Sequence, residues 1–253
     1  MIDVVASEWL KVRTVRSTWY LLLSVVGVLA LGSMISYLMT KEWDRSAPEI
    51  QAAFASADPS VVVMPFAQFA FGVLGALVAT SEYGNGMIRT VLVAAPRRLV
   101  VLAAKVVVVG LGGLVLGTVV SFAAFGIGEV IVGDRPAPLS GGPFSEALPA
   151  LLANGLAALV IALVGLGFGV LMRATAGALV TLCVLMFVLP VVAVLLPAPW
   201  NNRVVSVTPL YLGPQFSGQL TGQLTPAQAL VVMIVYVVVA LGAGALVLAR
   251  RDA

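Results

Sequence analysis

The residue types that most often catalyse reactions or bind metals are almost absent from this chain. Its 253 residues include no histidine and one cysteine, Cys183. The commonest general base, histidine-dependent triads and cysteine- or histidine-based metal clusters are therefore excluded. Cys183 falls in the middle of a hydrophobic run, where we expect a buried thiol without a chemical role. We predict no catalytic residue and no metal site on this chain.

Two glycine-containing strings resemble nucleotide-binding motifs, but their surroundings do not fit. Residues 139–142 read LSGG, which is similar to the start of the signature motif of nucleotide-binding ABC subunits, yet Pro143 follows them. No lysine of the chain has the preceding glycine and following Ser or Thr of a phosphate-binding loop. The GLGFG run at 165–169 lies inside a hydrophobic run and not between a strand and a helix. We predict that this chain holds neither ATP nor Mg²⁺ and is not an enzyme by itself.

The composition indicates a membrane protein. Hydrophobic residues make up 61% of the chain and charged residues 10%, whereas a soluble domain has about a quarter charged residues. Runs of about 20 apolar residues can cross a bilayer as helices. We predict six such spans: Trp19–Met39, Val61–Thr80, Val106–Gly128, Leu148–Met172, Ala176–Leu196 and Gln228–Ala249. No stretch between them reaches about 50 residues, so we predict an all-α fold and one transmembrane domain, residues 1–253.

The lysines and arginines predict the orientation. With six spans, both termini share a side with the connections between spans 2 and 3 and between spans 4 and 5. That side holds ten of the fourteen basic residues: Lys11, Arg13, Arg16, Arg89, Arg97, Arg98, Lys105, Arg173, Arg250 and Arg251. The positive-inside rule then predicts a multi-pass membrane protein with both termini in the cytoplasm.

Two segments outside the spans have distinctive patterns. Residues 1–18 predict an amphipathic helix with Trp9 near its apolar face, lying along the inner leaflet. It is either a membrane anchor or a helix that also helps to dock a cytoplasmic partner. Residues 197–227 are too polar to span but contain aromatic and aliphatic residues. We favour a re-entrant element there over a plain external loop.

Few residues inside the spans are polar. Gln68 and Asn154 are neutral, and no charged residue lies near the middle of a span, which argues against an ion-coupled carrier. Small residues predict helix-packing faces at Gly113 with Gly117 and at 165–169. Pro190 should kink the fifth span because it removes a backbone donor.

The stretch Ser81–Lys105, SEYGNGMIRTVLVAAPRRLVVLAAK, differs from every other connection. Glu82 ends the second span, and glycines at 84 and 86 break the helix. A short helix over Met87–Ala95 would then present four apolar residues on one face: Ile88, Val91, Leu92 and Ala95. Pro96 stops this helix. Three basic residues after it are expected to meet the lipid headgroups: Arg97, Arg98 and Lys105.

This pattern resembles the region between spans 2 and 3 of type-2 ABC exporter permeases, and the small actinobacterial-type members in particular. The likeness extends to the six spans, the basic amphipathic opening and the long last external loop. One departure is Met87, where family members usually have Thr.

The resemblance implies a coupling helix within 82–98 that fits a cleft on a separate cytoplasmic ABC ATP-binding subunit. Carried over to this sequence, the contact set is Glu82, Gly86, Ile88, Arg89, Val91, Leu92, Pro96 and Arg97. Glu82 and Arg89 would make polar contacts, the aliphatic residues would anchor the helix, and Pro96-Arg97 would fix its return to the bilayer. ATP and Mg²⁺ would bind the partner subunit.

The function expected from this resemblance is that of the transmembrane subunit of an ATP-driven exporter. A second permease, identical or homologous, would complete the path through the lipid bilayer, and Gln68 is the polar residue that we assign to it. Apolar walls favour an amphipathic or hydrophobic cargo such as a drug, lipid or peptide, and no nucleic acid is expected as a partner. The alternative is a non-transporting immunity or scaffold protein that binds a cytoplasmic partner through the same basic surface.

Overall fold

A computed structural model describes residues 2–84, 98–136, 139, 143–220 and 223–250 of the chain. Within these ranges the fold is all-helical, and six helices are long and apolar enough to cross a membrane. The elements are α1 (Ile2–Thr14), α2 (Arg16–Arg45), α3 (Pro48–Gln51), α4 (Ser60–Gly84), α6 (Arg98–Val132), α7 (Phe144–Met172), α8 (Thr175–Cys183), α9 (Leu189–Val194), α10 (Trp200–Val207), α11 (Pro209–Phe216) and α12 (Pro226–Arg250). The predicted all-α fold and the six spans are confirmed.

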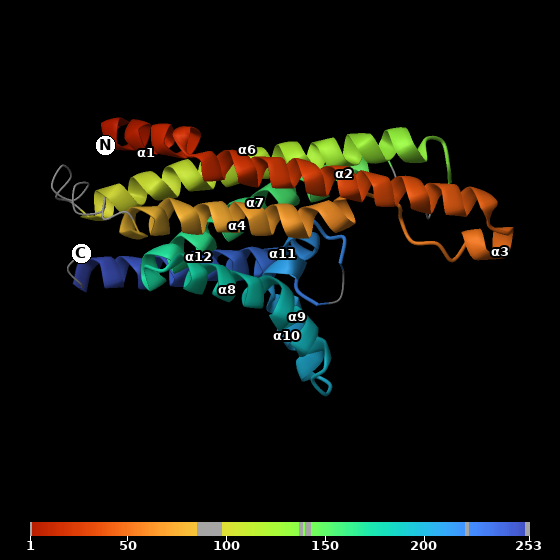
Figure 1. Ribbon diagram of the computed structural model, residues 1–253. Coiled ribbons are helices and arrows are strands. Elements are labelled where there is room, and N and C mark those ends of the chain that lie inside the picture. Colours follow the sequence, from red (N-terminus) through yellow and green to blue (C-terminus); the bar gives the residue numbers. More distant parts are fainter. Residues whose placement is uncertain (1, 85–97, 137–138, 140–142, 221–222, 251–253) are drawn as a thin grey trace.

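The long helices form one elongated bundle (Figure 1). Helix α1, the last turn of α12, the end of α4 and the start of α6 lie at the same end of it, and α3 lies at the other. We call these the terminal end and the distal end. This arrangement follows from an even number of spans, because each crossing reverses the direction of the chain.

Helix α7 forms the centre of the bundle and packs against α4, α6 and α12. Small residues allow this close approach: a methyl group on Gly165 would overlap the backbone of Gly72 in α4, and one on Gly167 would overlap Ala240 in α12. Gly113 and Gly117 of α6 likewise face Ala158. The predicted glycine packing faces are therefore confirmed.

The fifth span bends at the predicted place. A π-helical turn, Val184–Val188, separates α8 from α9, and Pro190 occupies the first turn of α9. In Figure 1, α9 and α10 run away from the axis of α8. Proline lacks the backbone N–H that would continue the α-helical ladder, so the π turn and the bend occur together.

The structure contradicts two predictions about single side chains. Cys183 is exposed, because Leu182 and Met186 occupy the buried face of this span. Lys105 was expected among the lipid headgroups, at the start of the third span. Helix α6 instead begins at Arg98, and Lys105 lies in its third turn with only 4% of its surface exposed.

The segment 197–227 contains two short helices, α10 and α11, and α11 packs against α7 and α12. Gln215 of α11 is fully buried and holds this segment together through its hydrogen bonds. Its amide nitrogen donates to the carbonyls of Ser206 and Tyr211, at 2.8 and 2.9 Å, and its amide oxygen accepts from the backbone of Leu224 at 3.0 Å. The backbone of this part is held by protein contacts, and a re-entrant placement stays a prediction.

Candidate functional site

Four charged side chains from three helices meet at the terminal end and form a closed ring of ion pairs. Glu8 and Lys11 come from α1, Glu82 from α4 and Lys105 from α6. The Lys11 ammonium lies 2.6 Å from the Glu8 carboxylate and 2.8 Å from that of Glu82. The Lys105 ammonium lies 2.7 Å from Glu8 and 2.8 Å from Glu82. Each charge in this ion-pair ring thus contacts two charges of the opposite sign.

The helices place these residues in a simple way. Glu8 and Lys11 are three residues apart on α1, so they lie on the same side of that helix. Glu82 is in the last turn of α4. Lys105 is in the third turn of α6, against which α1 packs. The ring therefore joins α1 to the two helix ends that flank residues 85–97.

Burial makes the pairing necessary. Glu8, Glu82 and Lys105 are 2%, 3% and 4% exposed, and the ring has two positive and two negative groups. A buried charge without a partner is strongly unfavourable, whereas a neutral and fully hydrogen-bonded set is tolerated. Lys105 also donates to the carbonyl of Val78 at 3.3 Å. The ring has the arrangement of a rigid brace between helices.

The pKa of Lys11 is raised by its place in this ring. Burial lowers that pKa, but hydrogen bonds to Glu8 and Glu82, together with their charges, raise it above the ordinary value of 10.5. Lys11 therefore stays charged at any physiological pH, and the alternation of charges in the ring is preserved.

A second contact braces the same region. The guanidinium of Arg173, which ends α7 with a φ of 53°, lies 5.2 Å from the ring centroid of Tyr83 in α4. A cation over an aromatic face is attracted by the ring electrons. The last turn of α4 is thus connected to α1, α6 and the end of α7.

Most of the predicted coupling residues lie outside the described residues: Gly86, Ile88, Arg89, Val91, Leu92, Pro96 and Arg97. Glu82 is described, and its carboxylate contacts Lys11 and Lys105 within this chain. Whether that carboxylate also reaches a partner is not tested by these contacts, and this role stays a prediction.

Of the four residues of the ring, sequence reasoning identified only Glu82 as a site residue; it missed Lys11 and the pair Glu8 and Lys105. Lys105 could have been singled out as a charge in an otherwise apolar helix, whereas Glu8 is one of several charged residues on the amphipathic α1. Their pairing was not visible, because 97 positions separate them in the chain.

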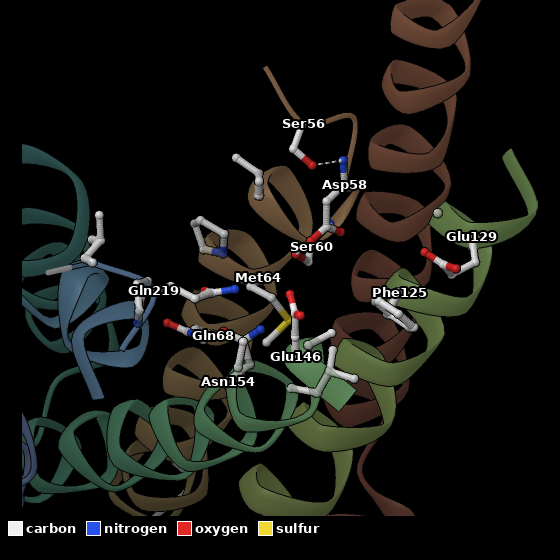
Figure 2. A pocket seen from close by; sticks show the side chains of 18 of the residues that line it. Ser56, Asp58, Ser60, Met64, Gln68, Phe125, Glu129, Glu146, Asn154 and Gln219 are labelled. Atoms are coloured by element: carbon white, nitrogen blue, oxygen red, sulfur yellow. Dashed lines mark hydrogen bonds between the residues drawn. The ribbon is translucent and has the colours of Figure 1, made fainter. Parts of the chain in front are cut away.

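The distal end holds a pocket of about 520 Å³ between α4, α6, α7 and α11. Three carboxylates contribute to its lining: Asp58, Glu129 and Glu146. Figure 2 shows Gln68, Asn154 and Gln219 gathered on one side of this distal pocket, with Glu129 across from them on α6. Its volume is within the range of small-molecule sites, about 300–1,000 Å³.

Gln68, which we assigned to the translocation path, lines this pocket. It is 5% exposed, and its amide oxygen has no hydrogen-bond partner in the described part of the chain. Asn154 differs, because its amide nitrogen donates to the Ser121 hydroxyl at 3.0 Å. The place of Gln68 in a path stays a prediction, but the structure does bring it to the wall of a cavity.

Among the described residues there is no group of three or more Cys, Asp or Glu side chains that could hold a metal ion. A comparison with curated proteins found no matching sequence. A family model described as "ABC-2 family transporter protein" matches residues 4–192, which include most of α1, the two helices α4 and α6 that flank residues 85–97, and most of the spans. With three quarters of its length covered by this match, the chain belongs to the ABC-2 family of transporter membrane proteins.

Proposed function

We propose that this permease subunit is driven by a separate cytoplasmic ATP-binding subunit and exports an amphipathic or hydrophobic cargo. The observation that carries the proposal is the ion-pair ring at the base of residues 85–97. A segment that transmits the motion of a partner needs a stiff connection to the spans, since a loose one would absorb the displacement. The ring supplies such a connection to α1, α4 and α6.

In this proposal, Arg89 and the apolar residues near it contact the ATP-binding subunit. Glu82 contributes mainly as a positioning residue, because its carboxylate is held by Lys11 and Lys105. Helix α1 takes part in coupling as well, since it holds two of the four charges. This favours a docking role for residues 1–18 over that of a membrane anchor alone.

The charges support the proposed orientation. In the described part of the chain, basic residues at the terminal end include Lys11, Arg13, Arg16, Arg173 and Arg250, and those at the distal end are Lys41, Arg45, Arg135 and Arg203. Together with the basic residues at 89, 97 and 98, this bias favours a cytoplasmic terminal end in the bacterial inner membrane.

A second permease copy would complete the transporter. Helices α2 and α12 have only 17% of their most apolar windows buried within one chain. They expose aliphatic side chains such as Leu23, Leu31, Val235 and Val239. Such faces are suited to lipid or to another permease subunit, and a path between two copies would have largely apolar walls.

The test is to co-express this chain with ABC ATP-binding subunits from the same genome, purify the complex that forms in lipid nanodiscs, and measure its ATP turnover. Arg89→Ala should lower co-purification or turnover at least about fivefold, since it removes a charged interface contact. The matched control is Arg45→Ala, because Arg45 is exposed at the distal end.

Glu82→Ala should lower ATP turnover of the complex while leaving some binding of the ATP-binding subunit. It weakens the ion pairs beside residues 85–97, whereas in this proposal the main contacts with that subunit are made by Arg89 and the apolar residues near it. If no ATP-binding subunit co-purifies, or if Arg89→Ala and Arg45→Ala behave alike, the proposal is wrong. A partner that binds with unchanged ATP turnover would support the scaffold alternative.

A further inference from the structure

We propose that the distal pocket is a binding site for an amphipathic primary amine that carries a second hydrogen-bond donor. Three independent features lead to this class of ligand: carboxylates in a lining whose described residues include no lysine or arginine, a buried amide oxygen without a partner in the described part of the chain, and apolar walls between them. The assignment of such an amine as cargo rests on the proposed function, but the binding itself does not.

The negative charge of the pocket lining favours a ligand with a positive charge. Asp58, Glu129 and Glu146 contribute to the lining, and none of the described lining residues is a lysine or an arginine. Asp58 accepts hydrogen bonds from the backbone N–H and the hydroxyl of Ser60, at 2.8 and 2.5 Å. Like charges that face one cavity raise its local concentration of cations, so a cationic group is attracted and an anionic one is repelled.

Gln68, which lies deeper in the pocket, favours a ligand that carries a hydrogen-bond donor. It lies eight residues after Ser60, the start of α4, which is about 12 Å along the axis at a rise of 1.5 Å per residue. Its buried amide oxygen can only accept a hydrogen bond, and leaving that oxygen unpaired is costly. This oxygen is closed to solvent in the structure, so a ligand N–H or O–H at this depth would satisfy it once the amide turns toward the cavity.

The walls between these polar groups select an amphipathic molecule. Met64 of α4, Phe125 of α6 and Leu151 of α7 line the pocket, so a bare metal ion or a small hydrophilic cation would leave this surface in contact with water. An extended ligand would place its ammonium among the carboxylates, its apolar body against these side chains and its second donor at Gln68. The wall formed by α11 is held in place by the hydrogen bonds of Gln215.

The binding test uses the purified chain in nanodiscs without any ATP-binding subunit. The probe is monodansyl-1,5-diaminopentane, which has a primary ammonium, an aromatic body and a sulfonamide N–H. Its N-acetylated analogue removes the charge and keeps the rest. Dansyl fluorescence should give saturable binding, and the amine should bind about tenfold more tightly than the neutral analogue at low salt.

Two sets of variants locate the binding. Glu129→Gln combined with Glu146→Gln should reduce the preference for the amine to less than about threefold, because two of the three charges are gone. Both residues are exposed, so these changes should be tolerated by the fold. Glu42→Gln is the matched control, since Glu42 is exposed on α2 and does not line the pocket.

Gln68→Leu should weaken binding of both the amine and its neutral analogue about three- to tenfold, because it removes one hydrogen bond common to the two ligands. Gln223→Leu is its control, because Gln223 is exposed and is not a lining residue. A probe with a methylated sulfonamide nitrogen should lose affinity for the unmodified protein and be insensitive to Gln68→Leu.

Equal binding of the charged and neutral probes would overturn the proposal, and so would a charge preference that survives the double substitution. An unchanged affinity in Gln68→Leu would exclude the donor contact. If Gln68→Leu does not fold, the carboxylate variants and the methylated probe still decide the matter. Binding without ATP-dependent transport of the probe by an otherwise coupled complex would exclude the cargo role, whereas failure of coupling leaves the binding result intact.

Discussion

The two ends of this bundle use charge in opposite ways. At the terminal end, Glu8, Lys11, Glu82 and Lys105 form a neutral, closed ring in which every charge has partners on other residues of the chain. At the distal end, three carboxylates and the amide oxygen of Gln68 belong to the lining of a cavity in which none of the described lining residues is a lysine or an arginine. Charges that pair with opposite charges hold helices together, whereas carboxylates without such a partner among the described residues are available to a cationic ligand.

The comparison therefore predicts that charges at the terminal end matter for stability and those at the distal end matter for binding. Substitutions that keep the shape of a side chain and remove its charge can test this directly. The expected effects on the free energy of unfolding decrease from Lys105 to Lys11.

Lys105→Met should have the largest effect, a loss of about 3 kcal/mol in the free energy of unfolding. It leaves two buried carboxylates to share one partly exposed ammonium, and an unpaired buried charge is strongly destabilising. Thermal unfolding of the purified chain in nanodiscs measures the loss. A midpoint equal to that of the unsubstituted chain would show that the ring is not a structural brace.

The same substitution at the two ends gives the sharpest contrast. Glu82→Gln should cost about 2 kcal/mol, because it leaves two ammonium groups with one carboxylate. Glu129→Gln should change stability by less than about 0.5 kcal/mol. Glu129 is exposed in the last turn of α6, where a negative charge gains nothing from the helix dipole. Equal effects in thermal unfolding would contradict the comparison.

A double-mutant cycle tests whether the ring acts as a unit. Glu8→Gln and Lys105→Met together remove one charge of each sign and leave the Lys11–Glu82 pair intact. The double variant should be more stable than the sum of the single losses predicts, by about 1 kcal/mol or more. Strict additivity would mean that the four charges act independently.

Among the residues of the ring, Lys11 is expected to have the smallest effect on stability, and its effect should depend on pH. Because its folded pKa is raised above 10.5, its contribution to stability is fully present below pH 10.5 and is lost as pH rises through the folded pKa. The unfolding midpoint of the unsubstituted chain should exceed that of Lys11→Met at pH 8 and approach it as pH rises toward 11. A difference that stays constant over this range would exclude the charge as its source.

Sequence reasoning succeeded where the determining signal is local. Each span is a continuous apolar run, so its existence follows from composition over about 20 residues. The contacts of Gly165 and Gly113 were also predictable, since only small side chains let helix backbones approach closely. The same approach was wrong for Cys183, because in an apolar span hydrophobicity alone does not indicate which face turns toward the neighbours.

Only part of each candidate site could be predicted from the sequence. The segment 82–98 was identified from its glycines, arginines and proline, and Gln68 from its polarity inside a span. The ring forms only where α1 approaches α4 and α6. The distal pocket forms only where α4, α6, α7 and the segment around α11 come together. The pattern of residues along one helix does not specify which residues of other helices it will contact.

The sequence by itself determined that this chain is an all-α membrane protein, where its spans lie, and which connection between them is unusual. Those properties depend on the transfer of short segments between water and lipid, which is a local free energy. Only the tertiary structure decided that Lys105 is a buried ion-pair partner and not a headgroup contact, and that Gln68 borders a cavity lined by carboxylates. Charge pairing and cavity shape depend on distances between residues far apart in the chain, and packing sets those distances.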